Sequence, residues 1–259
     1  MTAADLHCHI LPGLDDGPAD LHGSLVQAAQ HVTSGVELVV ATPHVREDLP
    51  GIDAPRIAAA TQALNEELAA HDAHLRLVPG AEVDLRWATR LDDAALGALT
   101  LGGSPWLLVE APLSAGKQDA DVLFGMLRAR GHRIVIAHPE RSPQFHRHPE
   151  LLRTLVAGGA VAQVTALALT GGFGSTARRY AGWMLDEQLA HVVASDAHDT
   201  RARPPGLVRP LEEAGYGDLA PWLTEHGPEA ILAGAAEVPV PPRPARGGRK
   251  RGLGRLRRR

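Results

Sequence analysis

A chain of 259 residues is long enough for one α/β barrel or two small domains. Hydrophobic residues make up 44% of the sequence but aromatic residues only 3%, so the core has to be built from Ala, Val, Leu and Ile, and a disordered chain is excluded. The single cysteine, Cys8, excludes an internal disulfide and favours a reducing, cytoplasmic compartment. We expect neither a signal peptide nor a membrane span, because no apolar run has the required length or position.

The net charge of −4 is unevenly distributed along the chain. Residues 243–259 hold nine of the 26 Lys and Arg residues, which leaves 17 basic against 30 acidic residues in the rest of the chain. Four prolines between positions 239 and 244 introduce this segment. We therefore expect a folded body over 1–238 and a disordered basic tail over 239–259. The tail predicts salt-sensitive attraction to an anionic lipid, nucleic acid or polymer, with a merely solvated tail as the alternative.

Strand-like and helix-like segments alternate along the body. After an N-terminal apolar run, the expected strands are 36–41, 75–78, 106–109, 133–137, 160–164 and 191–195. The expected helices are 20–34, 54–70, 119–130, 149–157 and 176–187, with helical sequence again over 206–235. The first helix is expected to bury the stripe Leu21, Leu25, Ala28, Ala29 and Val32. The alternation predicts an α/β fold of about seven parallel strands joined by right-handed helical crossovers.

The N-terminal run contains a His-x-His pair, His7 and His9, whose side chains lie on one face of a strand. Cys8 points to the opposite face, where we expect a small buried hydrophobe. The turn that follows contains two carboxylates, and we expect Asp16, rather than Asp15, to face the histidines. Imidazole and carboxylate are ligand types for Zn and Mn. Taken alone, an edge strand with two solvent-facing histidines explains the pair equally well.

Further ligand-type residues stand at or just after the ends of the later strands. They are His44, Glu82, Glu110, His138, Asp196 and His198. The carboxyl ends of parallel strands meet at one rim, where the active sites of α/β barrels assemble. So many such positions in series favour one shared multi-metal site over solvated surface residues.

The remaining histidines do not follow this pattern. His132 and His191 precede their strands and are expected at the opposite rim. The others stand on expected helices or loops and are predicted to be exposed and unbound: His22, His31, His71, His74, His146, His148 and His226.

Six motifs carry a resemblance that extends from residue 4 to about residue 206. They are Asp-Leu-His-Cys-His-Ile-Leu-Pro-Gly-Leu-Asp-Asp-Gly, Ala-Thr-Pro-His, Pro-Gly-Ala-Glu, Leu-Val-Glu-Ala-Pro, Ala-His-Pro-Glu-Arg and Ala-Ser-Asp-Ala-His. Together they resemble the PHP superfamily (polymerase and histidinol phosphatase). Within it they are similar to the bacterial manganese-dependent protein-tyrosine phosphatases of capsule and exopolysaccharide synthesis.

This resemblance implies a single-domain, distorted (β/α)7 barrel with three divalent metal ions, Mn²⁺ first, with Fe or Zn as alternatives. The implied ligands are His7, His9, Glu82 and Asp196 for the first ion, Glu82, Glu110 and His138 for the second, and Asp16, His44 and His198 for the third. It also implies that two arginines bind phosphate: Arg141, and Arg203 with Arg201 as the alternative. The implied partner is a phosphotyrosine-bearing protein, such as a tyrosine kinase of polysaccharide synthesis. That partner or the tail would provide any membrane association.

Three hypotheses of function remain. The first is a metal-dependent phosphomonoesterase acting on phosphotyrosine in proteins. The second is a phosphatase for a small metabolite such as histidinol phosphate, or a nuclease-like phosphodiesterase, because metals do not specify the leaving group. The third is a non-catalytic module that docks on a polyanion through the tail, which the complete ligand set disfavours. Cys8 lacks the Cys-x5-Arg surroundings of a cysteine phosphatase. Glu140 is a candidate for a supporting role and Phe173 for contact with a substrate ring.

Overall fold

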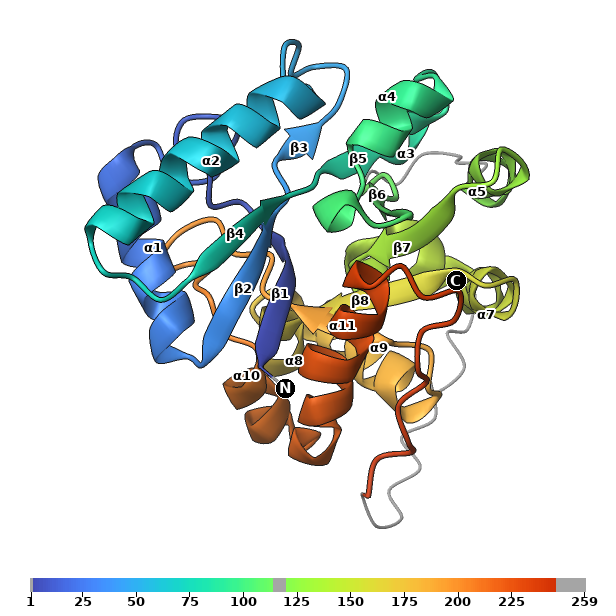
Figure 1. Ribbon diagram of the computed structural model, residues 1–259. Coiled ribbons are helices and arrows are strands. Elements are labelled where there is room, and N and C mark those ends of the chain that lie inside the picture. The colour runs from blue at the N-terminus through green and yellow to red at the C-terminus, as the bar shows by residue number, and fades with distance from the viewer. Residues whose placement is uncertain (1, 114–119, 246–259) are drawn as a thin grey trace.

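The computed structural model describes residues 2–113 and 120–245, in which strands and helices alternate (Figure 1). The strands are β1 (Ala3–Cys8), β2 (Val36–Ala41), β3 (His44–Val45), β4 (Arg76–Pro79), β5 (Glu82–Asp84), β6 (Trp106–Glu110), β7 (Arg133–Ala137), β8 (Val161–Thr165) and β9 (Val192–Ala194). The α-helices are α1 (Leu21–Thr33), α2 (Ala54–Ala70), α3 (Leu85–Ala88), α4 (Asp93–Ala98), α5 (Ala120–Ala129), α6 (Pro143–Arg147), α7 (Pro149–Ala157), α8 (Ala166–Thr170), α9 (Gly174–Asp186), α10 (Val208–Ala214) and α11 (Gly227–Leu232). Short 3-10 turns occupy Leu101–Gly103, Pro139–Arg141 and Gly217–Leu219, and a π-helical turn occupies Trp222–His226.

The strands form two parallel sheets, which meet where the strand structure is interrupted between β2 and β3 and between β4 and β5. One sheet has the order β1-β2-β4 and the other the order β3-β5-β6-β7-β8-β9. The first sheet passes into the second where β2 leads to β3 and β4 leads to β5. There Gly80 N donates to Ala41 O at 3.0 Å, and Glu82 N donates to Pro43 O at 3.1 Å. The strand pairs of both sheets are parallel, as the sequence predicted.

The end of the last strand returns to the first. His9 N donates to Ala197 O at 2.9 Å, and Asp196 N donates to His7 O at 2.8 Å. These bonds join segments almost two hundred residues apart, and they bring the segment after β9 beside the end of β1. The carboxyl ends of the strands therefore face a common region.

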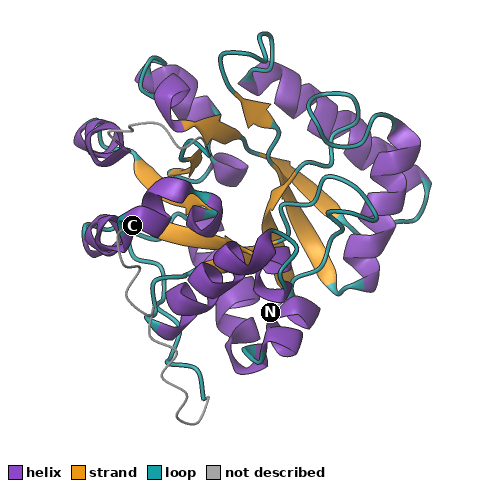
Figure 2. Ribbon diagram, turned by 180° about the vertical axis from the view of Figure 1, so that it is seen from behind, coloured by secondary structure: helices purple, strands orange, loops and turns teal. Residues whose placement is uncertain are grey.

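Helices cover the strands from outside (Figure 2). The strands are nearly continuous apolar runs, and all five residues of β6 are buried, as expected for a parallel sheet with both faces covered. α2 begins as its sequence predicts: the Asp53 side chain accepts from Arg56 N at 3.0 Å, and Pro55 stands in the first turn. No helix in the described parts of the chain combines the length and apolar character needed to cross a membrane.

The expected tail begins with residues that contact the body. Gln188 Nε2 donates to Pro241 O at 2.8 Å, and Ala245 N donates to Asp218 Oδ2 at 2.8 Å. Pro241 and Ala245, which the sequence assigned to a disordered segment, are thus hydrogen-bonded to residues just after α9 and in the 3-10 turn Gly217–Leu219. The rest of that segment, 246–259, lies outside the described residues.

The loop after β1 turns back tightly over the strand at Gly17. A Cβ atom at this position would lie 2.5 Å from the backbone oxygen of His9, a contact that side chains do not make. Glycine therefore lets the two preceding carboxylates lie over the strand end. By contrast, Gly97 in α4 has no atom within 4 Å of a Cβ.

We expect Gly17→Ala to lower the free energy of unfolding by about 1–3 kcal/mol, because the loop has to move away from β1. Gly97→Ala is the matched control and should raise it by up to about 1 kcal/mol, since alanine favours a helix. Urea unfolding of both variants measures the difference. Equal effects of the two substitutions would show that the close approach at Gly17 imposes no constraint.

Candidate metal centre

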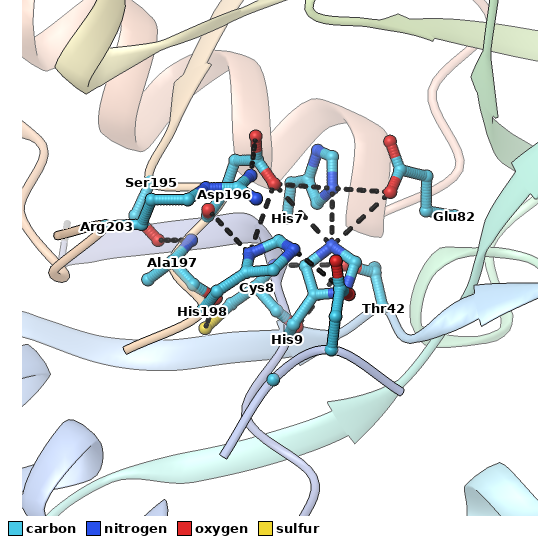
Figure 3. Close-up of polar contacts among 12 residues, drawn as sticks. His7, Cys8, His9, Thr42, Glu82, Ser195, Asp196, Ala197, His198 and Arg203 are labelled. Atoms are coloured by element: carbon cyan, nitrogen blue, oxygen red, sulfur yellow. Dashed lines mark hydrogen bonds and ion pairs between the residues drawn. The ribbon is translucent and has the colours of Figure 1, made fainter. Parts of the chain in front are cut away.

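β1 directs two imidazoles into one buried centre (Figure 3). His7 Nε2 and His9 Nε2 lie 3.2 Å apart, and both side chains are fully buried. The other nitrogen of each ring has an acceptor: His7 Nδ1 lies 3.1 Å from Gln163 Oε1, and His9 Nδ1 lies 2.6 Å from Asp15 Oδ2. With the protons on Nδ1, the lone pairs on Nε2 face the centre, as they do in histidines that bind metals.

Glu82 lies where four imidazoles converge. Its Oε2 atom is 3.3 Å from Nε2 of both His7 and His9. The same oxygen is 3.0 Å from His44 Nδ1, whereas Oε1 is 2.7 Å from His138 Nε2. Burial would raise the pKa of Glu82, but the neighbouring histidines, His7 first, hold it well below its usual range. A carboxylate with its two oxygens directed in this way can bridge two cations, whereas an imidazole ordinarily does not.

Asp196 lies two residues beyond β9, and its two carboxylate oxygens contact different groups. Oδ1 lies 3.4 Å from His7 Nε2 and 3.6 Å from His9 Nε2. Oδ2 accepts hydrogen bonds from Arg141 Nη1 and, at 2.6 Å, from Arg203 Nη2. Burial would raise the pKa of Asp196, but His7 and the other cationic neighbours outweigh it and lower the pKa.

Two of the ligand-type residues have a left-handed backbone conformation. The φ angle is +29° at His138 and +51° at Asp196. Such angles cost non-glycine residues about 1–3 kcal/mol each and occur preferentially at functional sites. Hydrogen bonds hold both residues in place: His138 N donates to Gln163 Oε1 at 3.2 Å, and Asp196 N donates to His7 O at 2.8 Å.

Asp16 closes the centre on its solvent side. Its Oδ1 atom lies 3.3 Å from His198 Nε2 and 3.6 Å from His44 Nε2, while 56% of its side chain is exposed. Asp15 instead turns inward, where its Oδ2 also accepts from His44 N at 2.9 Å. Asp16 thus faces the imidazoles, as the sequence predicts, and Asp15 positions His9.

The donor set fits divalent cations. Glu82 Oε2, Asp196 Oδ1 and His198 Nε2 are buried and form no hydrogen bond with any residue that the structure describes. Burial, followed by the charge of Glu82, raises the pKa of Glu110 well above its usual range, and Glu110 Oε1 lies 3.6 Å from His138 Nε2. Buried carboxylates this close to one another remain charged only when positive charge neutralises them.

All nine ligand positions predicted from the sequence fall into four overlapping groups. The groups are His9, Asp16, His44 and His198; His7, His9 and Glu82; His7, His138 and Asp196; and His44, Glu82 and Glu110. Within each group the ligand atoms lie within 4.8 Å of one another. The grouping differs from the one that the resemblance implies, because His9 also lies near Asp16 and His44 also lies near Glu110.

The two predicted phosphate-binding arginines stack on one aromatic ring. The guanidinium carbon of Arg141 lies 4.5 Å from the ring centroid of Phe173, and that of Arg203 lies 5.5 Å from it. Both arginines line a cleft of about 850 Å³ together with Glu82, Glu110 and other charged residues. Arg201, the alternative to Arg203, is exposed and does not line this cleft. The ring of Phe173 therefore packs against the guanidinium groups of both arginines.

The prediction for the first helix and for one histidine was wrong. α1 buries Ser24, Gln27, Ala28 and His31, whereas three of the five residues of the expected stripe are exposed: Leu21, Ala29 and Val32. His31 is fully buried, and its Nε2 atom lies 3.3 Å from Cys8 Sγ. Hydrophobic spacing misplaced the helix because its buried face is partly polar. Cys8 is buried as predicted, but its neighbours include polar side chains.

The other histidines and Glu140 lie outside the centre. His22, His71, His74 and His148 are exposed, as predicted, and His146 and His226 are half-buried. His191 is buried and His132 half-buried at the amino ends of their strands. Glu140 Oε1 accepts from Thr165 N at 2.8 Å, so this buried carboxylate supports the end of β8, and burial raises its pKa to about 7.

Two residues that position ligands were missed by the sequence analysis. Gln163 contacts both His7 and the backbone of His138, and Asp15 contacts His9. Gln163 left one signal in the sequence, since it is the only amide side chain in the apolar strand β8.

Comparison with known proteins places the chain in a family. Residues 3–214 match the family described as "Capsular polysaccharide synthesis, CpsB/CapC". The chain is 32% identical to the tyrosine-protein phosphatase YwqE of Bacillus subtilis over 93% of this chain and 96% of that protein. It is 26% identical to the tyrosine-protein phosphatase CpsB of Streptococcus agalactiae over 78% of this chain and 86% of that protein.

A solved structure agrees with the sequence comparisons. It is similar to this one with a TM-score of 0.80 and 30% identity, over 94% of this chain and 99% of that chain. This structure is one of a set described as crystal structures of YwqE from Bacillus subtilis and CpsB from Streptococcus pneumoniae, "unique metal-dependent tyrosine phosphatases". The chain therefore belongs to the CpsB/CapC family of capsular polysaccharide synthesis.

Proposed function

We propose that this protein is a metal-dependent protein-tyrosine phosphatase that acts on a phosphotyrosine-bearing protein of capsule or exopolysaccharide synthesis. The observation that carries the proposal is the position of Glu82, one buried carboxylate within 3.3 Å of imidazole nitrogens from His7, His9, His44 and His138. An arrangement of this kind suits several closely spaced cations. The named phosphatases YwqE and CpsB support the choice of reaction.

In this proposal residues 1–238 form a PHP-type (β/α)7 barrel with three divalent ions, Mn²⁺ first. The barrel is supported by the strand order and by the hydrogen bonds that lead from β9 back to β1. The ions would be held by the nine grouped residues: His7, His9, Asp16, His44, Glu82, Glu110, His138, Asp196 and His198. Bound cations supply Lewis-acid chemistry, polarising phosphoryl oxygens and acidifying water.

The side chains of the protein orient the phosphate group. Arg141 and Arg203 offer planar forks that match two phosphate oxygens each. Asp196 and Phe173 hold both guanidinium groups at the cleft, so the arginines are oriented before the substrate arrives. Negative charge that develops on the phosphoryl oxygens then meets fixed positive charge, which lowers the barrier.

The cleft and the leaving group favour phosphotyrosine over other phosphate esters. The cleft is open and wide, about 850 Å³, and its rim contains exposed charged side chains such as Glu47 and Asp48. A protein-borne phosphotyrosine extends its phosphate on a long rigid arm into such a cleft. Its aryl oxide also leaves readily, so little general-acid help is needed.

The basic segment has a separate place in the proposal. Its nine cations over 243–259 would attach the enzyme to an anionic lipid or polymer near its partner. This assignment rests on charge alone and leaves the catalytic domain complete without the segment.

Glu82→Gln should lower turnover of a phosphotyrosine peptide by about 100-fold or more, because an amide cannot neutralise the cations that a carboxylate bridges. Metal analysis of the purified variant should show fewer bound ions at an unchanged circular dichroism spectrum. Glu47→Gln at the rim is the matched control and should retain both turnover and metal. Wild-type metal content and activity in Glu82→Gln would contradict the bridging role.

The substrate class can be tested with the manganese-loaded protein. We expect kcat/KM to be higher for phosphotyrosine peptides than for phosphoserine peptides or histidinol phosphate. A chelator should abolish all three activities and added Mn²⁺ should restore them, whereas thiol alkylation should have little effect because Cys8 is fully buried. A preference for histidinol phosphate would reject the tyrosine-phosphatase assignment and leave the metal centre intact.

Phe173→Leu should lower kcat/KM by about 5- to 30-fold, the effect of losing about 1–2 kcal/mol of cation–π attraction to the two arginines. KM should rise and kcat should fall, because the arginines contact phosphate in the ground state and the transition state. Phe173→Tyr retains the ring face and should stay near wild type. An equal loss in both variants, or a loss confined to thermal stability, would reject a positioning role for the ring.

A further inference from the structure

A second cluster of buried ligand-type side chains lies between β1 and α1. Cys8 Sγ is 3.3 Å from His31 Nε2, and His31 Nδ1 is 3.8 Å from Asp5 Oδ2. All three side chains are fully buried, and one potential ligand atom from each lies within 4.8 Å of the others. The sulfur lies on the side of the strand away from Glu82 (Figure 3). None of the three residues is among the nine of the candidate metal centre.

Several polar atoms of this cluster have no hydrogen-bond partner within residues 2–113 and 120–245. They are Asp5 Oδ2, His31 Nδ1 and, beside them, Gln27 Oε1. The second carboxylate oxygen of Asp5 does have partners, since Oδ1 accepts from His7 N at 3.3 Å and from Ser195 N at 3.0 Å. Buried polar groups are nearly always paired, so the free carboxylate oxygen of Asp5 beside the His31 ring calls for a ligand.

We propose that Asp5, Cys8 and His31 bind one divalent cation of the zinc type, separate from the phosphatase centre. Thiolate, imidazole and carboxylate are the donors that zinc takes in proteins. With a Zn–S distance of about 2.3 Å and a Zn–N distance of about 2.0–2.1 Å, tetrahedral geometry separates sulfur from nitrogen by about 3.6 Å. The observed separation of 3.3 Å is close to this value. The thiolate disfavours Mn²⁺ and Mg²⁺ here, because these ions prefer oxygen ligands.

One amide donor lies beside the sulfur. Gln27 Nε2 donates to Cys8 Sγ at 3.3 Å, a contact that a negative sulfur strengthens. When the metal–sulfur bond forms, the thiol proton passes to solvent, and no oxidation or reduction takes place. The ion would join α1 to β1 directly behind His7 and His9, and so hold the strand that carries these two imidazoles.

The test uses the fact that Cys8 is the only cysteine of the chain. Metal-free protein is titrated with Co²⁺, and the near-ultraviolet spectrum is followed for a thiolate-to-cobalt charge-transfer band. Histidine and carboxylate ligands at the phosphatase centre produce no such band. We expect the band in the wild-type protein and its complete loss in Cys8→Ser.

Substitutions in α1 test whether His31 binds the cobalt ion that gives the band. His31→Ala should abolish it or weaken it by at least 10-fold, whereas His22→Ala, an exposed histidine on the same helix, should retain it in full. Glu82→Gln should also retain the band, which separates this site from the phosphatase centre. After equilibration with Zn²⁺, Cys8→Ser should contain one zinc ion fewer per chain than the wild type.

Two results would overturn the proposal. One is the absence of a thiolate band in wild-type protein whose circular dichroism spectrum is native. The other is a band that His31→Ala leaves unchanged, because the sulfur would then bind cobalt without this histidine. If phosphotyrosine turnover is normal while the band is absent, the phosphatase function stands and the cluster is a metal-free part of the core.

Discussion

The centre depends on one electrostatic constraint: buried carboxylates and imidazoles are packed together without enough protein charge to balance them. Glu82 lies among four imidazoles, while Glu110 lies close enough to Glu82 to have its pKa raised. Glu82 Oε2 and Asp196 Oδ1 face imidazole nitrogens but accept no hydrogen bond from any described residue. Bound cations would supply the missing positive charge, and the left-handed backbone at His138 and Asp196 is of the kind that occurs preferentially at functional sites.

The parallel fold makes such packing possible. Each strand delivers its next residues to the same end, and the hydrogen bonds between His7, His9 and the segment after β9 bring the ends of the first and last strands together. The interruption between β2 and β3, and between β4 and β5, turns His44 and Glu82 toward His9. A regular strand in either place would carry these two side chains past the centre.

Sequence patterns predicted the strand–helix alternation and that nine ligand-type side chains would lie close together, because the carboxyl ends of parallel strands meet at one rim. They did not predict β5, since a three-residue strand has no measurable periodicity. They misplaced the buried face of α1, where Gln27 and His31 are buried through contacts with Cys8, a residue far from them in the chain. Gln163 and Asp15 were missed for a related reason, because a residue that orients a ligand is recognised only by its tertiary contact.

The divided carboxylate of Asp196 has a thermodynamic consequence. One oxygen faces the imidazoles and the other holds Arg141 and Arg203. A cation held by the first oxygen would draw electron density from the carboxylate and weaken its hydrogen bonds to both arginines. An anion bound by these arginines would then strengthen the binding of the cation by the same factor by which the cation strengthens the binding of the anion. Metal affinity and anion affinity would thus be coupled through one side chain.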